Sequence, residues 1–107
     1  MKYRILLSCN AGLSTSMLVE KMKESASAQA IDADILAVRA NSVEDYVNDY
    51  DVILLGPQVR FMKKQIESRV SVPVDVIDGM DYGMLEGGNV LKQAMDIIDK
   101  GEWSEKY

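Results

Sequence analysis

The residues with the clearest capacity for chemistry lie in one short stretch, Ser8 to Ser16, which contains the only cysteine, Cys9. Small and hydroxyl-bearing residues follow this cysteine, and a helical pattern begins at about Ser14. Small side chains let backbone N–H groups approach a tetrahedral anion, and Gly12 tolerates a positive φ. A helix N-terminus also favours an anion, through its unpaired N–H groups and its dipole. The stretch therefore predicts a phosphate-binding loop, in which the same field favours the thiolate form of Cys9.

An ordinary core cysteine is the alternative, because cysteines in small apolar-rich domains are commonly buried and inert. The position of Cys9 favours a functional thiol, since we expect it to follow the apolar strand Tyr3 to Leu7 and not to lie within it. The hydroxyls of Ser14, Thr15 and Ser16 either bind the anion or cap the helix.

The composition limits what the thiol can do. The sequence contains no histidine, which excludes a Ser-His or Cys-His catalytic pair and a phosphohistidine on this chain. One cysteine makes no internal disulfide, and without a second cysteine or a histidine a zinc site is not expected. No metal or diffusible cofactor is implied.

Length and charge narrow the class of protein. The 107 residues, of which 48% are hydrophobic, predict a single domain with one core. We assign it to residues 1–101, followed by a polar C-terminal tail at 102–107. The net charge of −5, without a basic cluster, argues against nucleic acid or an anionic membrane as the main partner. No apolar run is long enough to span a bilayer and no signal peptide is recognisable, so we expect a cytoplasmic protein.

Strand and helix patterns alternate along the chain. Four short apolar segments predict strands, at Tyr3–Leu7, Ala33–Val38, Asp51–Leu55 and Val72–Ile77. Between and after them, helical spacing predicts helices at about 14–26, 43–46 and 59–70, and from about Met84 to Ile98. Asp78 to Gly83 is predicted to be a loop. The methionines at helical spacing are interpreted as core residues.

This alternation predicts an α/β fold: a single-domain, open, four-stranded parallel sheet in the order 2-1-3-4, with helices on both faces. In such sheets ligands bind beyond the carboxyl ends of the strands, where the strand order reverses. Here that point lies between the first and third strands. Three loops should converge there, namely Cys9 to Ser16, Gly56 to Arg60, and Asp78 to Gly83.

The second and third of these loops hold further candidate contacts. Gln58 and Arg60 follow the third strand, where either is a candidate for binding the phosphoryl group or a partner, although Arg60 is equally well a solvated residue of a turn. Asp78 and Asp81 follow the fourth strand and are candidates for a general acid or for capping a turn. Tyr82 either covers the phosphate loop or packs against it.

The first loop resembles that of the low-molecular-weight tyrosine phosphatases, in which Cys is followed by five residues and then Arg-Ser/Thr. In this chain Thr15 occupies the arginine position, and Ser16 matches the next one. A guanidinium there would stabilise the transition state of transfer and of hydrolysis. Its absence weakens the phosphatase interpretation and suits a loop that keeps a phosphoryl group away from water.

A second resemblance covers nearly the whole chain. The segment Ile5 to Met17 (ILLSCNAGLSTSM), the segment Leu54 to Arg60 (LLGPQVR) and the later Asp81-Tyr82-Gly83 are similar to the IIB component of the lactose, chitobiose and cellobiose branch of the bacterial phosphoenolpyruvate-dependent sugar phosphotransferase system.

This second resemblance implies that Cys9 accepts a phosphoryl group from a phosphohistidine on a IIA protein. It further implies that Cys9 passes the group to a sugar carried by a membrane IIC permease, with a β-linked disaccharide such as cellobiose or chitobiose expected. The phosphate-binding residues are then the ones that follow Cys9: Asn10, Ala11, Gly12, Leu13, Ser14, Thr15 and Ser16.

Two other classes of protein stay open. A phosphatase-like or arsenate-reductase-like thiol enzyme is opposed by Thr15 and by the lack of a second cysteine. A non-catalytic flavodoxin-like or receiver-like module is opposed because Ser8-Cys9 stands where a receiver has acidic residues, and because a dinucleotide-binding glycine triplet is missing.

Overall fold

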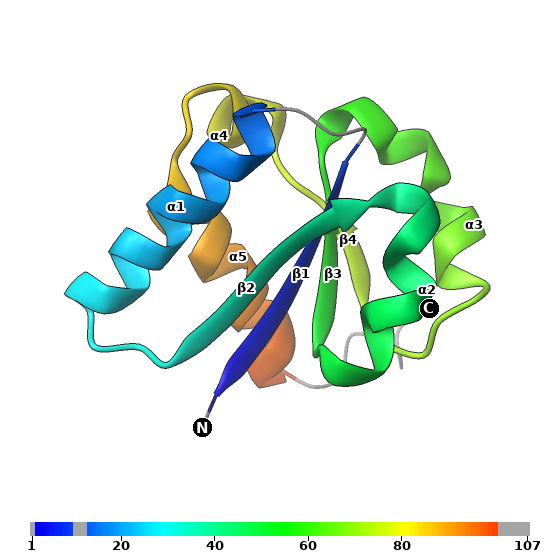
Figure 1. The fold of residues 1–107 in the computed structure, drawn as a ribbon, viewed down its shortest axis with the longest axis horizontal. Coiled ribbons are helices and arrows are strands. Elements are labelled where there is room, and N and C mark those ends of the chain that lie inside the picture. The colour runs from blue at the N-terminus through cyan, green and yellow to red at the C-terminus, as the bar shows by residue number, and fades with distance from the viewer. Residues whose placement is uncertain (1, 10–12, 101–107) are drawn as a thin grey trace.

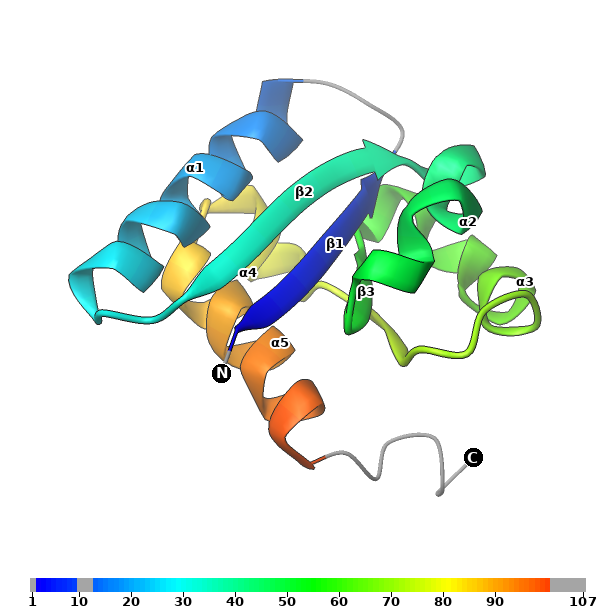
Figure 2. The same cartoon turned by 60° about the horizontal axis from the view of Figure 1, so that its bottom comes forward.

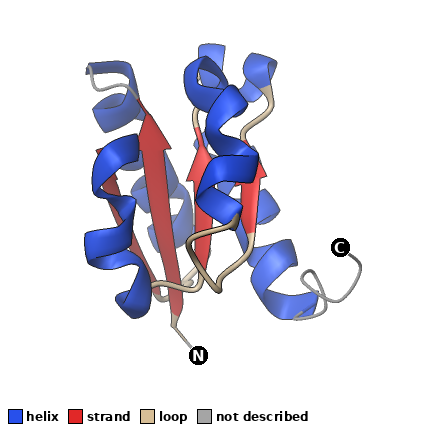
Figure 3. Cartoon of the chain, turned by 90° about the vertical axis from the view of Figure 1, so that its right-hand side faces the viewer, coloured by secondary structure: helices blue, strands red, loops and turns tan. Residues whose placement is uncertain are grey.

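Four parallel strands form one sheet in the order β2-β1-β3-β4, which confirms the predicted topology. The structure is a computed structural model that describes residues 2–9 and 13–100. The predicted tail at 102–107 lies outside the described residues, as do Asn10, Ala11 and Gly12. In Figure 3 the strand arrows point the same way, so their carboxyl ends share one edge. The strands are β1 Tyr3–Cys9, β2 Ala33–Arg39, β3 Val52–Leu55 and β4 Val74–Val76.

The first strand is longer than predicted. Cys9 is its last residue, because Cys9 pairs in register with Arg39 of β2 and the ladder continues to that point. The expectation that Cys9 follows the strand is therefore wrong, because the strand continues past Leu7 through Ser8 and Cys9. The consequence is that backbone pairing with β2 positions Cys9 at the carboxyl edge of the sheet.

Helices cover both faces of the sheet, and Figures 1 and 2 show α1, α4 and α5 on one side and α2 and α3 on the other. None of the described helices is long and apolar enough to cross a membrane. The helices are α1 Leu13–Ala28, α2 Val43–Tyr46, α3 Lys63–Glu67, α4 Gly79–Gly83 and α5 Gly87–Lys100, with 3-10 turns at Ala40–Ser42, Val47–Asp49 and Pro57–Met62.

Alternation along β1 divides the core between the two faces. Ile5 and Leu7 pack against α1 and α5, whereas Leu6 packs among residues of the α2 and α3 side. All three side chains are at most 1% exposed. By the same alternation Cys9 lies on the face of α1 and α5.

The segment after β4 is a helix, and the prediction of a loop from Asp78 to Gly83 is wrong. The Asp78 carboxylate accepts hydrogen bonds from the backbone N–H groups of Met80 and Asp81, at 2.9 and 3.1 Å. This is the N-cap arrangement, which offsets the low helix propensity of the two glycines, Gly79 and Gly83.

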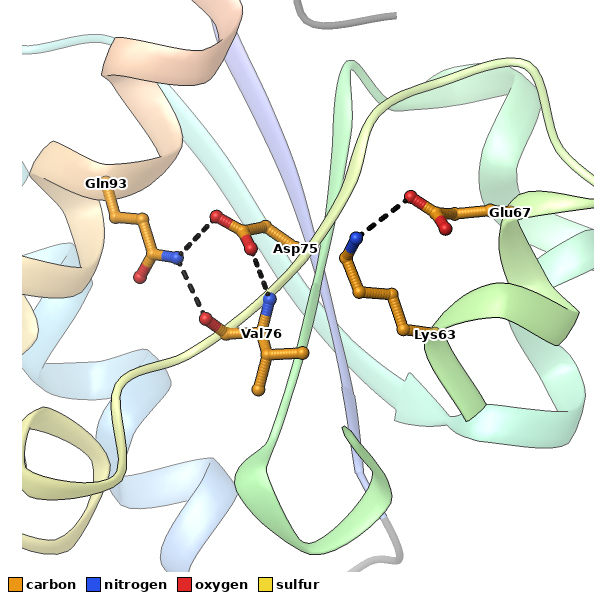
Figure 4. Close-up of polar contacts among 5 residues, drawn as sticks. All are labelled: Lys63, Glu67, Asp75, Val76 and Gln93. Atoms are coloured by element: carbon orange, nitrogen blue, oxygen red, sulfur yellow. Dashed lines mark hydrogen bonds and ion pairs between the residues drawn. The ribbon is translucent and has the colours of Figure 1, made fainter. Parts of the chain in front are cut away.

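Side chains form hydrogen bonds with backbone groups on the outer edge of β4, the last strand of the sheet. In Figure 4 the Gln93 amide of α5 donates to the Asp75 carboxylate and to the Val76 carbonyl, both at 3.0 Å, and Asp75 accepts from the Val76 N–H. These bonds occupy backbone groups that an edge strand otherwise offers to another chain. The same view shows Lys63 paired with Glu67 along α3, at 3.1 Å.

The crossing of α1 and α5 depends on Gly87. A Cβ at this position would lie 2.6 Å from the backbone nitrogen of Met22 and would also collide with the backbone of Lys21. At the neighbouring Gly88, the nearest atom to such a Cβ is the hydroxyl of Ser25, at 3.3 Å. Only the first of these glycines is therefore required for the close approach of the helices.

We predict that Gly87→Ala lowers the free energy of unfolding by about 3 kcal/mol, because backbone atoms must move to admit the methyl group. Gly88→Ala is the matched control and should change it by no more than about 1 kcal/mol, since the added Cβ meets one side chain and improves helix propensity. Urea unfolding measures both. Equal losses in the two variants would contradict the account of this crossing.

Candidate functional site

Cys9 lies at the carboxyl end of β1 with 5% of its surface exposed. Its sulfur is 2.7 Å from the hydroxyl oxygen of Thr15, in the first turn of α1. Thr15 is itself only 4% exposed. The strand and the helix that follows it therefore bring a thiol and a hydroxyl into a buried hydrogen bond.

A third polar group completes this contact. The phenolic oxygen of Tyr82, in α4, lies 2.8 Å from the Thr15 hydroxyl oxygen, and Tyr82 is buried. Residues separated by 67 positions in the sequence are thus joined at one point. The third predicted loop does reach the Cys9 region, through Tyr82.

Ionisation of the thiol fixes the direction of these hydrogen bonds. A thiolate only accepts, so Thr15 must then donate its one hydroxyl hydrogen to the sulfur. Its oxygen is left to accept from the Tyr82 hydroxyl. Both hydroxyl hydrogens then point along the chain of contacts toward the sulfur, from Tyr82 to Thr15 and from Thr15 to Cys9.

The turn after β3 packs directly against the same residue. The Gly56 N–H donates to the Ser8 carbonyl at 2.8 Å, and a Cβ at position 56 would lie 3.2 Å from the Cβ of Cys9 and 2.8 Å from Oε1 of Gln58. Only glycine fits without displacing a neighbour. The second predicted loop therefore also converges on the site, with Gln58 exposed at its rim.

Arg60 and Asp81 make contacts within their own part of the chain. The Arg60 guanidinium donates to the Pro57 carbonyl at 3.0 Å, and the Asp81 carboxylate accepts from the Asn89 amide at 3.1 Å. Both contacts are local, which suits the structural roles that the sequence offered as alternatives to binding a phosphoryl group or a partner. Binding of a phosphoryl group or a partner by Gln58, Arg60, Asp81 or Tyr82 stays a prediction.

The predicted phosphate loop is only partly within the described residues. Asn10, Ala11 and Gly12 lie outside them, whereas the backbone of α1 is described from Leu13 onward. The first N–H groups of a helix have no partner inside it and favour an anion. Because Thr15 holds the Cys9 sulfur beside this terminus, a phosphoryl group on the sulfur would lie within reach of it.

A surface pocket of about 310 Å³ opens over Cys9 on the β2 side of the site. Thr15 and the exposed Ser16 contribute to it from α1. Three further residues were not identified from the sequence, namely Arg39, Ser42 and Tyr46. The register of β2 against β1 brings Arg39 to the pocket, and no sequence motif predicts that register.

Within residues 2–9 and 13–100 no cluster of three or more metal-ligating side chains occurs.

We predict that Thr15→Val slows alkylation of Cys9 by iodoacetamide at neutral pH by about tenfold, because the thiolate loses a buried donor. The variant also leaves the Tyr82 hydroxyl unpaired, which should lower the free energy of unfolding by about 1 to 3 kcal/mol. Thr15→Ser keeps the hydroxyl and serves as the control. Equal alkylation rates in the valine and serine variants would contradict the role given to this hydrogen bond.

Ser8 gives a second test of the polar groups around Cys9. Its side chain is 1% exposed, and its hydroxyl has no hydrogen-bond partner in the part of the chain that the structure describes. Ser8→Ala removes a buried polar atom without breaking such a bond, so we expect the free energy of unfolding to rise by up to about 1 kcal/mol. A fall in the free energy of unfolding of more than about 1 kcal/mol, measured by thermal or urea unfolding, would show that the Ser8 hydroxyl makes a stabilising hydrogen bond.

Comparison with known proteins identifies chains similar to this one. Residues 4–93 match the family model described as the lactose/cellobiose-specific IIB subunit of the PTS system. The oligo-beta-mannoside-specific EIIB component of Bacillus subtilis strain 168 is 38% identical over 98 residues, which cover 89% of this chain and 95% of the relative. The galactose-specific EIIB component of Lactococcus lactis subsp. cremoris strain MG1363 is 39% identical over 103 residues, with the same coverage.

A solved structure is similar over nearly its whole length. The solution structure of the cellobiose-specific phosphotransferase IIB component from Borrelia burgdorferi superposes with a TM-score of 0.80 at 37% identity. The match covers 94% of each chain. Sequence and fold therefore point to the same group of proteins.

Proposed function

The chain belongs to the lactose- and cellobiose-specific IIB subunits of the sugar phosphotransferase system, and from this premise we propose that Cys9 is its phosphoryl carrier. IIB components are phosphotransferases, so the activity of the chain is phosphoryl transfer. In the proposed reaction a IIA protein gives the group to Cys9 from a phosphohistidine. A sugar bound by a membrane IIC permease then receives it.

The placement of the Cys9 sulfur is the main support for choosing this residue as the carrier. Its sulfur lies beneath an open pocket at the carboxyl edge of the sheet, next to the first turn of α1 and hydrogen-bonded to Thr15. A nucleophile for phosphoryl transfer needs a route to its donor and a site that accepts negative charge. The pocket supplies the first requirement, and the helix terminus with the Thr15 hydroxyl supplies the second.

The proposed chemistry uses the sulfur twice. The Cys9 thiolate attacks phosphorus, the S–P bond forms, and the N–P bond of the phosphohistidine breaks, with its electron pair returning to the imidazole. In the second transfer a sugar hydroxyl attacks phosphorus, and the S–P bond breaks to regenerate the thiolate as the hydroxyl proton is released. The Thr15 hydroxyl stabilises the sulfur as nucleophile and as leaving group.

Within the predicted loop, backbone and hydroxyl groups hold the phosphoryl group in this proposal. The candidates are the residues from Asn10 to Ser16, with Gln58 and Tyr82 at the edges of the site. Tyr82 acts through Thr15, because its hydroxyl is bonded to that residue. Gln58 is exposed and its side-chain oxygen lies close to Gly56, so we propose it as a contact for an incoming partner.

The arginine of the related phosphatases has no room at position 15. Thr15 is 4% exposed between Cys9 and Tyr82, so a guanidinium there would break both hydrogen bonds and overfill the site. A buried hydroxyl at this position supports a carrier, in which the phosphoryl group waits for a partner and is not passed to water. Asp78, a candidate general acid for hydrolysis, caps α4 instead.

The sugar and the location of the protein are separate proposals from the carrier residue. The compared proteins carry different sugar names at similar identity, so identity alone selects none of them. We propose a β-linked disaccharide such as cellobiose or chitobiose as the acceptor, with the chain acting in the cytoplasm, where phosphoenolpyruvate is used.

We predict that the wild-type chain gains one phosphoryl group when it is mixed with phosphoenolpyruvate, the general phosphotransfer proteins and a cognate IIA protein. Cys9→Ser should gain none, because a serine hydroxyl at neutral pH is a far weaker nucleophile than a thiolate. Intact-mass spectrometry reads the addition directly. Equal labelling of the serine variant would exclude Cys9 as the carrier.

The same preparation separates the carrier from a phosphatase. A phosphatase-like enzyme turns over an aryl phosphate without any partner protein, and we expect no such turnover from this chain. Sustained, Cys9-dependent release of inorganic phosphate from that substrate would favour the thiol-enzyme alternative.

A further inference from the structure

One positively charged side chain, that of Arg39, lines the pocket over Cys9. Arg39 is the last residue of β2 and pairs in register with Cys9, the last residue of β1. Neighbouring residues of paired strands project to the same face of a sheet, about 5 Å apart. Arg39 and Cys9 therefore leave the sheet on the same side, at its carboxyl edge, and both line the pocket.

The strand pattern supports this orientation independently. Ile35 and Ala37 precede Arg39 at intervals of two; Ile35 is buried in the core beneath α1 and α5, and the partly buried Ala37 packs against that core. Alternation then places Arg39 above that core, on the face that holds Thr15. The apolar side chains on this face of β2 are thus followed by an arginine at the end of the strand, next to the site.

The Arg39 guanidinium is available to an anion. Its side chain is exposed, and across residues 2–9 and 13–100 it makes no hydrogen bond or ion pair. Glu44, the first acidic residue after the pocket-lining Ser42, is paired with Arg69 at 3.4 Å. Among the described residues that line the pocket, Arg39 alone is charged.

We propose that Arg39 binds the phosphoryl group during its transfer to and from Cys9. This deepens the proposed function and rests on it. A planar guanidinium donates two parallel hydrogen bonds to phosphoryl oxygens, which suits a group that carries two negative charges. The phosphatase loop places its arginine within the loop; here the guanidinium comes from the neighbouring strand and lines the same pocket as Thr15.

The role in each step follows from the charge. As the S–P bond forms and the N–P bond of the donor breaks, the three phosphoryl oxygens keep their charge next to a thiolate nucleophile. Arg39 offsets the repulsion between these two anions, which share one pocket. In the transfer to a sugar it holds the same oxygens while the sulfur departs as thiolate. Arg60 does not take this role, because its guanidinium is bonded to the Pro57 carbonyl.

The test compares Arg39→Gln with Arg4→Gln. Arg4 is also exposed and lies on β1, five residues before Cys9 and roughly 16 Å away along the strand. Each variant removes one positive charge, so any effect of net charge on the acidic chain is the same in both. The measured quantity is the initial rate of phosphoryl gain by intact mass, over a range of phosphorylated IIA concentrations.

We expect Arg39→Gln to lower the maximal rate by about tenfold, as befits one hydrogen-bonded charge, with the half-saturating IIA concentration unchanged. Arg4→Gln should match the wild type, and Arg39→Lys should recover part of the loss because it restores the charge without the planar pair of donors. Circular dichroism and thermal melting confirm that each variant is folded.

Two results would overturn the proposal. An unchanged maximal rate in Arg39→Gln would show that Arg39 does not contact the phosphoryl group during transfer. A rise in the half-saturating concentration alone makes Arg39 a docking residue and not a phosphoryl contact. Both results leave Cys9 phosphorylation intact, so they are distinct from failure of the proposed function, in which the wild type itself gains no phosphoryl group.

Discussion

The site depends on the buried hydrogen bond between the Cys9 sulfur and the Thr15 hydroxyl, which in turn bonds to Tyr82. This chain of contacts connects the end of β1, the start of α1 and the short helix α4. Each member is at most 7% exposed, so solvent does not compete for the donors. The sheet places the thiol at its carboxyl edge, and the two helices supply the hydroxyl groups that lie next to the sulfur.

The rest of the fold keeps this contact in place. Gly56 lets the turn after β3 approach Cys9, and Gly87 lets α5 approach the backbone of α1. Asp78 caps α4 and so orients the helix that presents Tyr82. The core residues on the two faces of β1 anchor the strand between its helical layers. Packing far from the sulfur thereby fixes the distances at the site.

Much of this arrangement was predictable from the sequence, because its signals are local. The apolar runs predicted the strands, and their alternation with helices predicted the parallel sheet. The helix α4 was missed because Gly79 and Gly83 outweighed the N-cap signal of Asp78. The strand end at Cys9 was missed because strand length depends on a pairing with Arg39, thirty positions away.

The long-range contacts at the site were not predictable for the same reason. Thr15 was a candidate from its place in the loop, but its bond to Tyr82 depends on how α1 and α4 pack. Arg39, Ser42 and Tyr46 belong to no motif and reach the pocket only through the register of β2 and the turn that follows it. Periodicity assigns a residue to a face, whereas only the folded sheet shows which faces meet.

The central claim is that the sulfur holds a phosphoryl group for a partner and withholds it from water. The most direct measurement follows the group after it is loaded. The phosphorylated chain is isolated with a ³²P label, then divided between buffer and membranes that contain the IIC permease with cellobiose. The account predicts a label that persists in buffer and moves to the sugar on the membranes. Release of the label as inorganic phosphate at the same rate in both would contradict it.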